Sequence, residues 1–164
     1  MTIATTTIAA TTIAAAATTT ATPTTTAAPT TTAAPTTTVD PLVADTALIK
    51  ALYRAYSDSW FDGRDAGLQF IADHNYPGFY NAFEDIQLCS NLVSDEAVVD
   101  PATIEPDPDW MLPSSDPLGG LPLAGTIYIS TVEFTSKFPD GTTSTQRVEV
   151  HQAIMNGTAY FFQC

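Results

Sequence analysis

The residues of this sequence that could carry out acid–base chemistry are few, and several lie near the end of the chain. His151 follows Glu149 by two positions in an alternating segment, so the two side chains share one face of a predicted strand. A histidine beside a carboxylate is suited to act as a general base. Asp73 and His74 form a second polar pair, and Tyr53 is a further ionisable candidate. The candidate catalytic residues are therefore His151, Glu149, Asp73 and Tyr53.

Each of these candidates also has a structural interpretation, which we favour. A half-buried sheet has one apolar face toward the core and one polar face toward solvent. The polar residues that would share such a solvent face are Glu133, Arg147, Glu149 and His151. Asp73 and His74 precede Pro77 at a predicted helix end, where polar side chains commonly satisfy exposed carbonyl groups.

Tyr56 and Trp110 are the candidate ligand-binding residues. Tyr56 belongs to the apolar stripe of a predicted helix, where a core position is the simpler interpretation. Trp110 lies in a Pro-rich segment and could cover an open end of the domain or mark an interaction surface. The spacing typical of metal sites, phosphate-binding loops and nucleophile elbows does not occur. We expect no metal and no cofactor.

The strands that would position His151 form the clearest pattern in the chain. Two alternating segments rich in β-branched and aromatic residues flank Pro139-Asp140-Gly141, which predicts a long hairpin. Bringing the two apolar faces together sets Val132 opposite Val148 and closes the loop at Phe138 and Thr142. The same register places Glu133 opposite Arg147, an independent favourable pair. A last short strand follows Asn156-Gly157.

Upstream of the hairpin the pattern is mainly helical. Apolar residues at helical spacing predict a first helix from Ala47, capped by Asp45 or Thr46 and ended at Gly63. A second helix is predicted from Asp65 to Asp73 or His74, and a third over residues 79–88. Residues 97–106 have the pattern of a strand. We expect it at the edge of the sheet, because Pro101 and Pro106 cannot donate hydrogen bonds to a neighbouring strand. Residues 107–123 predict an irregular loop anchored by Trp110 and Met111.

The composition divides the 164-residue chain in two. Residues 1–39 are almost entirely Thr, Ala, Pro and Ile, and a Thr-Thr-Thr-Ala-Ala-Pro unit repeats within them. Such a segment cannot bury a core, so we predict a disordered low-complexity tail followed by a single domain over residues 43–164. Thr-rich, Pro-punctuated tracts are typical of O-glycosylated stalks, which favours an extracellular or cell-surface protein; a low-complexity extension of a cytoplasmic protein is the alternative.

The charge of the chain limits its partners. All 18 acidic and all 5 basic residues follow residue 39, and they give residues 40–164 a net charge of −13. Nucleic acids and anionic membrane surfaces repel such a field, so we expect neither as a partner. The tail is too rich in Thr to predict insertion into a membrane.

The two cysteines, Cys89 and Cys164, leave two interpretations open. They could form one disulfide that ties the chain end to the helical part, which requires an oxidising compartment, or they could be two unrelated small apolar residues. In the first case the bond would close a loop of about 75 residues, which stabilises by roughly 4 kcal/mol in the chain-entropy model.

The order of elements predicts an α+β fold, with helices on one side of a curved antiparallel sheet. Three features resemble the nuclear-transport-factor-2-like superfamily, also called SnoaL-like or cystatin-like: the segment from Leu48 to Gly63 in the long first helix, the second helix, and the closing strands at residues 148–162. The resemblance covers residues 43–164 and is one of layout and hydrophobic pattern. It implies a cone-shaped domain in which the sheet wraps around the first helix.

The resemblance implies two classes of function, because the superfamily contains both enzymes and binding domains. The first is a module, exported or tethered to a surface, that binds a small apolar ligand or a protein, or forms a homodimer. The second is a small-molecule isomerase, hydrolase or dehydratase that uses a pocket inside the cone. We favour the first, since the sequence offers no convincing acid–base set.

Overall fold

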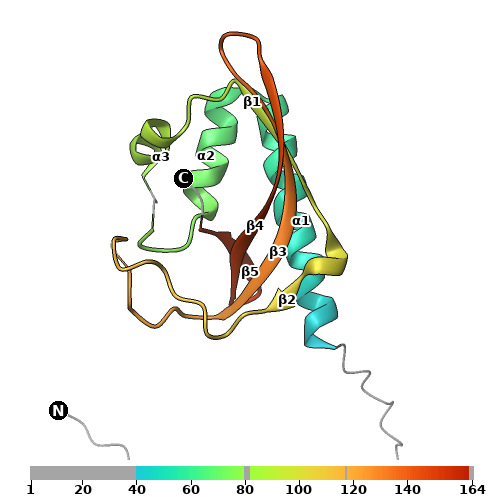
Figure 1. Ribbon diagram of the computed structural model, residues 1–164, viewed down its shortest axis with the longest axis vertical. Helices are drawn as coiled ribbons and strands as arrows, with labels where there is room; N and C mark the ends of the chain where they lie inside the picture. Colours follow the sequence, from blue (N-terminus) through green and yellow to red (C-terminus); the bar gives the residue numbers. More distant parts are fainter. Residues whose placement is uncertain (1–39, 80–81, 117, 163–164) are drawn as a thin grey trace, which may run out of the picture. The chain divides into compact units, whose positions relative to one another are not determined.

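The structure, a computed structural model, describes residues 40–79, 82–116 and 118–162, and within them the chain is α+β (Figure 1). The helices come first: α1 (Pro41–Phe61), α2 (Arg64–His74) and α3 (Phe83–Cys89). The strands follow: β1 (Ser94–Val99), β2 (Glu105–Pro106), β3 (Thr126–Lys137), β4 (Thr143–Met155) and β5 (Thr158–Phe161). The predicted tail, residues 1–39, and the predicted bond to Cys164 lie outside the described residues.

The strands form one curled antiparallel sheet in the order β1-β3-β4-β5, and β2 pairs with β3 beyond the end of β1. The predicted hairpin register is confirmed: Val132 lies opposite Val148, and Glu133 lies opposite Arg147. The Phe138 amide donates to the Thr142 carbonyl at 3.0 Å and closes the loop as expected. The segment at residues 97–106 also lies at the sheet edge, as its prolines predicted.

The first helix begins six residues earlier than the sequence pattern predicted, at Pro41 instead of Ala47. Asp40 is the N-cap, and its carboxylate accepts a hydrogen bond from the Leu42 amide at 2.9 Å. Proline is favoured at the first helical position because its missing N–H needs no partner there. Asp45, the cap predicted from sequence, lies inside the helix and accepts a hydrogen bond from the Tyr128 hydroxyl at 2.6 Å.

Two other local predictions are corrected. The third helix begins at Phe83 and not at Phe79, which lies in the turn after α2 and packs in a separate apolar cluster. In the Pro-rich loop Met111 is exposed, whereas its neighbour Leu112 is buried and Trp110 is partly buried. The loop is therefore held by Trp110 and Leu112.

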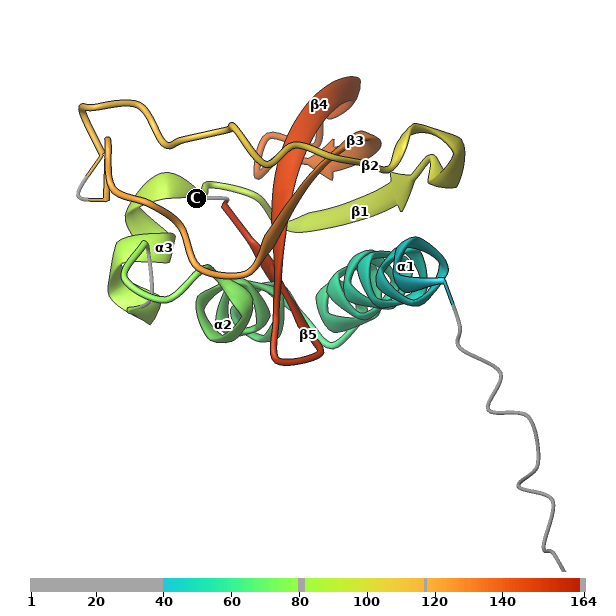
Figure 2. The same ribbon diagram turned by 90° about the horizontal axis from the view of Figure 1, so that it is seen from below.

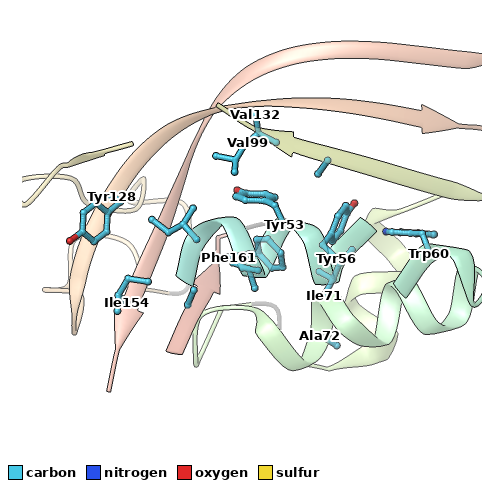
Figure 3. Packing of buried hydrophobic residues seen from close by; sticks show 14 of the residues in the cluster. Tyr53, Tyr56, Trp60, Ile71, Ala72, Val99, Tyr128, Val132, Ile154 and Phe161 are labelled. Carbon is cyan, nitrogen blue, oxygen red and sulfur yellow. The ribbon is translucent and has the colours of Figure 1, made fainter. Parts of the chain in front are cut away.

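Both faces of the sheet are covered at the end near β5. On one face α1 and α2 lie side by side, and their apolar residues form the main core with Val132, Ile154 and Phe161 (Figures 2 and 3). On the other face the loop between β2 and β3 packs Trp110 and other apolar side chains over Ile127, Ala153 and Met155. The alternation of side chains along β4 sends even-numbered residues to the helices and odd-numbered residues to the loop.

The edge strand β1 is tied to α1. The Ser57 hydroxyl accepts a hydrogen bond from the Ala97 amide at 2.8 Å and lies 3.1 Å from the Ala97 carbonyl, to which it donates. These contacts satisfy backbone groups that would otherwise be free on the outer side of the strand. They also fix the start of β1 against the C-terminal half of α1, where the candidate site lies.

Candidate functional site

A buried carboxyl group, that of Asp95, lies inside the curled sheet. Asp95 has the same parity on β1 as Ala97 and Val99, so its side chain points toward the helices, and it is only 5% exposed. One carboxylate oxygen accepts a hydrogen bond from the Tyr56 hydroxyl, and the other accepts from the Ser136 hydroxyl at 2.8 Å. The sheet register sets Ser136 directly opposite Asp95, so three elements converge on this group.

Burial raises the pKa of the Asp95 carboxyl above its usual range, because the charged form loses hydration. The hydrogen bonds from Tyr56 and Ser136 favour the ionised form and partly offset this effect. Buried ionisable groups with shifted pKa values gather at functional sites, although structural networks shift them too. Asp95 is therefore the group inside the sheet that is best suited to exchange a proton or bind a polar ligand.

Trp60 supplies an unused hydrogen-bond donor beside this carboxyl group. Its side chain is 4% exposed, and within the described residues its indole Nε1 is the one buried side-chain nitrogen or oxygen without a hydrogen-bond partner. The ring packs edge-on against Tyr56, with centroids 6.2 Å apart, and both rings extend from α1 (Figure 3). Leaving such a donor unpaired costs about 1–3 kcal/mol, so a ligand that accepts this hydrogen bond would recover part of that energy.

A cavity of about 230 Å³ connects these groups. Its wall combines the C-terminal end of α1 (Ser57, Trp60 and Phe61), the start of β1 at Asp95, and the loop end of the β3–β4 hairpin at Lys137. Asp95, which carries an acceptor, and Trp60, which carries a buried donor, both border this cavity. It can therefore bind a small molecule that has an apolar body and one or two polar atoms.

A second buried polar network crosses the core further along α1. The fully buried Gln152 donates to the Tyr53 hydroxyl at 2.7 Å, and the Ser130 hydroxyl donates to the Gln152 side-chain oxygen at 3.2 Å. Burial raises the pKa of the Tyr53 hydroxyl far above its usual range, so this tyrosine stays neutral. The network is satisfied by its own members, which is the property of a structural network.

His151 and Tyr53 lie on opposite sides of the sheet. His151 is an odd-numbered residue of β4, so it faces the loop, where it is half-buried. Its Nε2 lies 3.0 Å from the Asp107 carboxylate, and its ring stacks on Trp110 with centroids 4.0 Å apart. Trp110 thus covers His151 and belongs to the packing of the loop.

The other predicted residues are also dispersed. Glu149 is exposed on β4, opposite Thr131 of β3. Glu133 and Arg147 lie on the same face of the sheet and are also exposed. Asp73 is exposed near the end of α2 and accepts a hydrogen bond from Gln69 at 2.8 Å. The structure therefore brings His151 together with Trp110, and Tyr56 together with Asp95. It does not bring His151, Glu149, Asp73 and Tyr53 to one cavity.

Asp95 and Trp60 were not among the residues singled out from sequence. The signal for Asp95 was its parity with Ala97 and Val99, which is visible once the strand is extended back to Ser94. Trp60 could not be recognised in this way, because an unpaired indole N–H has no sequence signature. Both depend on contacts between segments far apart in the chain.

The described residues contain no cluster of His, Cys, Asp and Glu that could hold a metal ion, and none of their helices is long and apolar enough to cross a membrane. Comparisons of the chain with protein-family models, curated proteins and solved structures found no match. The side chain of Cys89 and the whole of Cys164 lie outside the described residues, so the predicted disulfide stays a prediction.

Proposed function

We propose that residues 43–164 form a ligand-binding module of the nuclear-transport-factor-2-like kind, with its ligand in the cavity beside Asp95. The α+β order and the curled sheet on a long first helix support the kinship, and they are the features a cone fold requires. The observation that carries the binding proposal is the unpaired, buried indole N–H of Trp60. Native proteins seldom leave such a group without a partner.

The chemistry of the cavity defines the ligand. Trp60 requires an acceptor, such as a carbonyl oxygen, and Asp95 favours a donor, such as an amide or hydroxyl group. The aromatic walls of Trp60 and Phe61 favour a flat apolar body attached to the two polar atoms. A small aromatic or cyclic molecule that carries an amide or a hydroxyketone meets these requirements.

Enzymatic activity on such a molecule is the second candidate function, of the isomerase, hydrolase or dehydratase kind. It is favoured by one observation: Asp95 combines a raised pKa with a place in the wall of the cavity, which suits a general acid or base. Turnover of a cyclic ketone or ester that disappears in Asp95→Asn, while binding persists, would establish it. If the domain binds such a molecule and does not convert it, the result supports a binding module and contradicts the enzymatic function.

Benzamide is a suitable first probe, because its carbonyl oxygen can accept from Trp60 and its amide can donate to Asp95. With the indole nitrogens labelled by ¹⁵N, titration should move the Trp60 N–H resonance and leave that of Trp110 in place. Trp60→Phe keeps an aromatic ring but loses the donor, and it should weaken binding by about 2- to 12-fold. Trp110→Phe is the matched control and should bind as the wild type does.

Toluene completes the test, since it has a similar shape and no polar atom. If the ligand is held by the Trp60 donor, toluene should bind more weakly than benzamide. Equal binding of the two probes, or a response from Trp110 alone, would contradict the proposal.

A further inference from the structure

A second surface, which shares Ser57, Phe61 and Glu96 with the wall of the cavity beside Asp95, runs along the outer side of α1. Figure 2 shows α1 at one end of the helical layer, with α2 on one side of it. The exposed residues on its outer side recur at helical spacing and include Lys50, Ala51, Arg54, Asp58 and Phe61. Together with β1 this stripe borders an open groove of about 540 Å³.

The stripe combines exposed apolar area with an ordered distribution of charge. Phe61 is 82% exposed, and Val98 across the groove is 59% exposed. The N-terminal half carries Lys50 and Arg54, two of the five basic residues of the chain, while Asp58 and Asp62 follow in the C-terminal half. One helix face is therefore positive at one end and negative at the other, and the β1 side of the groove beside it is lined by apolar side chains and by Glu96.

Contacts within the molecule account poorly for this charge order. Acidic groups at the C-terminal end of a helix oppose the helix dipole, and α1 has no basic residue in its last turn. Arg54 and Asp58 lie four residues apart, and both side chains are largely exposed. The Arg54 Nε atom is 3.9 Å from Oδ2 of Asp58. The basic residue comes first in this pair, which is the weaker of the two orientations on a helix.

We propose that this stripe is a self-complementary interface through which two copies of the chain pair with their α1 helices antiparallel. A two-fold axis near the middle of the stripe would place Arg54 of each copy opposite Asp58 of the other. The same axis would place Lys50 opposite Asp62, so that every charge on the stripe meets its opposite. Two-fold interfaces require such a patch, because the same residues serve both subunits.

The side-chain sizes fit the same arrangement. Ala51 lies ten residues before Phe61, about 15 Å along the helix, and an antiparallel pair brings the two opposite each other. The large exposed ring of Phe61 would then enter the groove of the second copy beside Ala51, between α1 and β1. Exposed apolar patches bordered by charges are typical of interaction sites. The occupant of the groove is therefore a second copy of this chain.

Sedimentation velocity of the full chain tests the proposal, at concentrations up to about 200 µM. Salt at about 0.15 M screens the long-range repulsion between two acidic copies, and it weakens the close ion pairs of the interface much less. We expect a concentration-dependent dimer. Lys50→Glu with Arg54→Glu, and separately Asp58→Lys with Asp62→Lys, should each raise the dissociation constant at least about tenfold. Phe61→Ser should do the same.

Mixing the two charge-reversed variants is the decisive step, because it also distinguishes a lost interface from a lost fold. Each variant alone places like charges opposite one another. In the mixture, the new carboxylates at positions 50 and 54 of one variant face the new ammonium groups at positions 62 and 58 of the other, so a heterodimer should form. Glu149→Lys, on the opposite side of the domain's sheet, is the control and should leave the dimer unchanged. A monomeric wild type, or a mixture that fails to associate, would overturn the proposal.

Discussion

At the scale of single residues, Asp95 is a buried carboxyl group that borders a cavity. Its two oxygens accept from Tyr56 and Ser136, and the third neighbour, Trp60, offers a donor that nothing in the described residues accepts. A carboxylate and an unused N–H in one small cavity form a pair of complementary contacts. This arrangement suits a ligand more than it suits stability.

The raised pKa of Asp95 has a consequence for stability. The folded state binds the Asp95 proton more tightly than the unfolded chain does, so this residue favours folding most at low pH. That contribution is lost as the pH rises through the folded-state pKa. Between about pH 4 and about pH 8, the free energy of unfolding of the wild type should therefore fall relative to that of Asp95→Asn.

Urea unfolding of the two proteins at matched pH values measures this difference in the free energy of unfolding. The contributions of the other carboxyl groups cancel in the difference, because both proteins contain them. Asp109→Asn, at an exposed position, is the control for the substitution itself. A difference for Asp95→Asn that stays flat, or that rises with pH, would contradict the assigned environment.

At the scale of elements, the position of Trp60 depends on a close approach between α1 and α2. Trp60 lies near the end of α1 and packs against Gly67 of α2. A Cβ atom at Gly67 would lie 2.3 Å from Cδ2 of the indole, far inside van der Waals contact. The glycine therefore sets the distance between the two helices and the orientation of the ring beside the cavity.

Gly67→Ala should destabilise the domain by about 1–3 kcal/mol, because a buried indole has little room to move. The loss should exceed the gain of about 1 kcal/mol that alanine brings to a helix. Urea unfolding measures the effect. In a Trp60→Phe background the smaller ring should relieve the overlap and reduce the cost. An equal cost in both backgrounds would show that Gly67 acts through something other than Trp60.

The elements also show how far the sequence could predict the structure. The hairpin register followed from alternation alone, because a shift by one residue would turn every apolar side chain of β4 to the wrong face. The start of α1 could not be decided in the same way. Asp40, Asp45 and Thr46 are all capable caps, and the contact that uses Asp45 instead comes from Tyr128, 83 residues away.

The candidate site was the least predictable part, for the same reason. Asp95 is a site residue only because Tyr56 and Ser136, 39 and 41 residues distant, meet it inside the sheet. His151 is half-buried because an aperiodic loop covers it. The sequence of that loop contains no pattern that indicates which face of β4 the loop packs against. Local periodicity predicts which face of an element is apolar; it does not predict what covers the other face.

At the scale of the whole molecule, the two proposed surfaces meet at Phe61, which borders both the cavity beside Asp95 and the groove along α1. Association of two copies would change the rim of the cavity. A ligand that binds one assembly state more tightly would shift the balance between them, and association would change ligand affinity by the same factor.

The division of the chain bears on the cellular location of the protein. An uncharged Thr/Ala/Pro-rich segment comes first, and all charged side chains follow it. We propose that the protein is exported or attached to a cell surface, and that residues 5–38 carry O-linked glycans. Protein from the native host should then be found outside the cytosol, with a mass above that of the sequence by multiples of a sugar unit. Replacing the threonines of residues 24–38 with alanine should remove part of that excess. Recovery only from the cytosol, at the unmodified mass and with Cys89 and Cys164 reduced, would instead favour the cytoplasmic alternative.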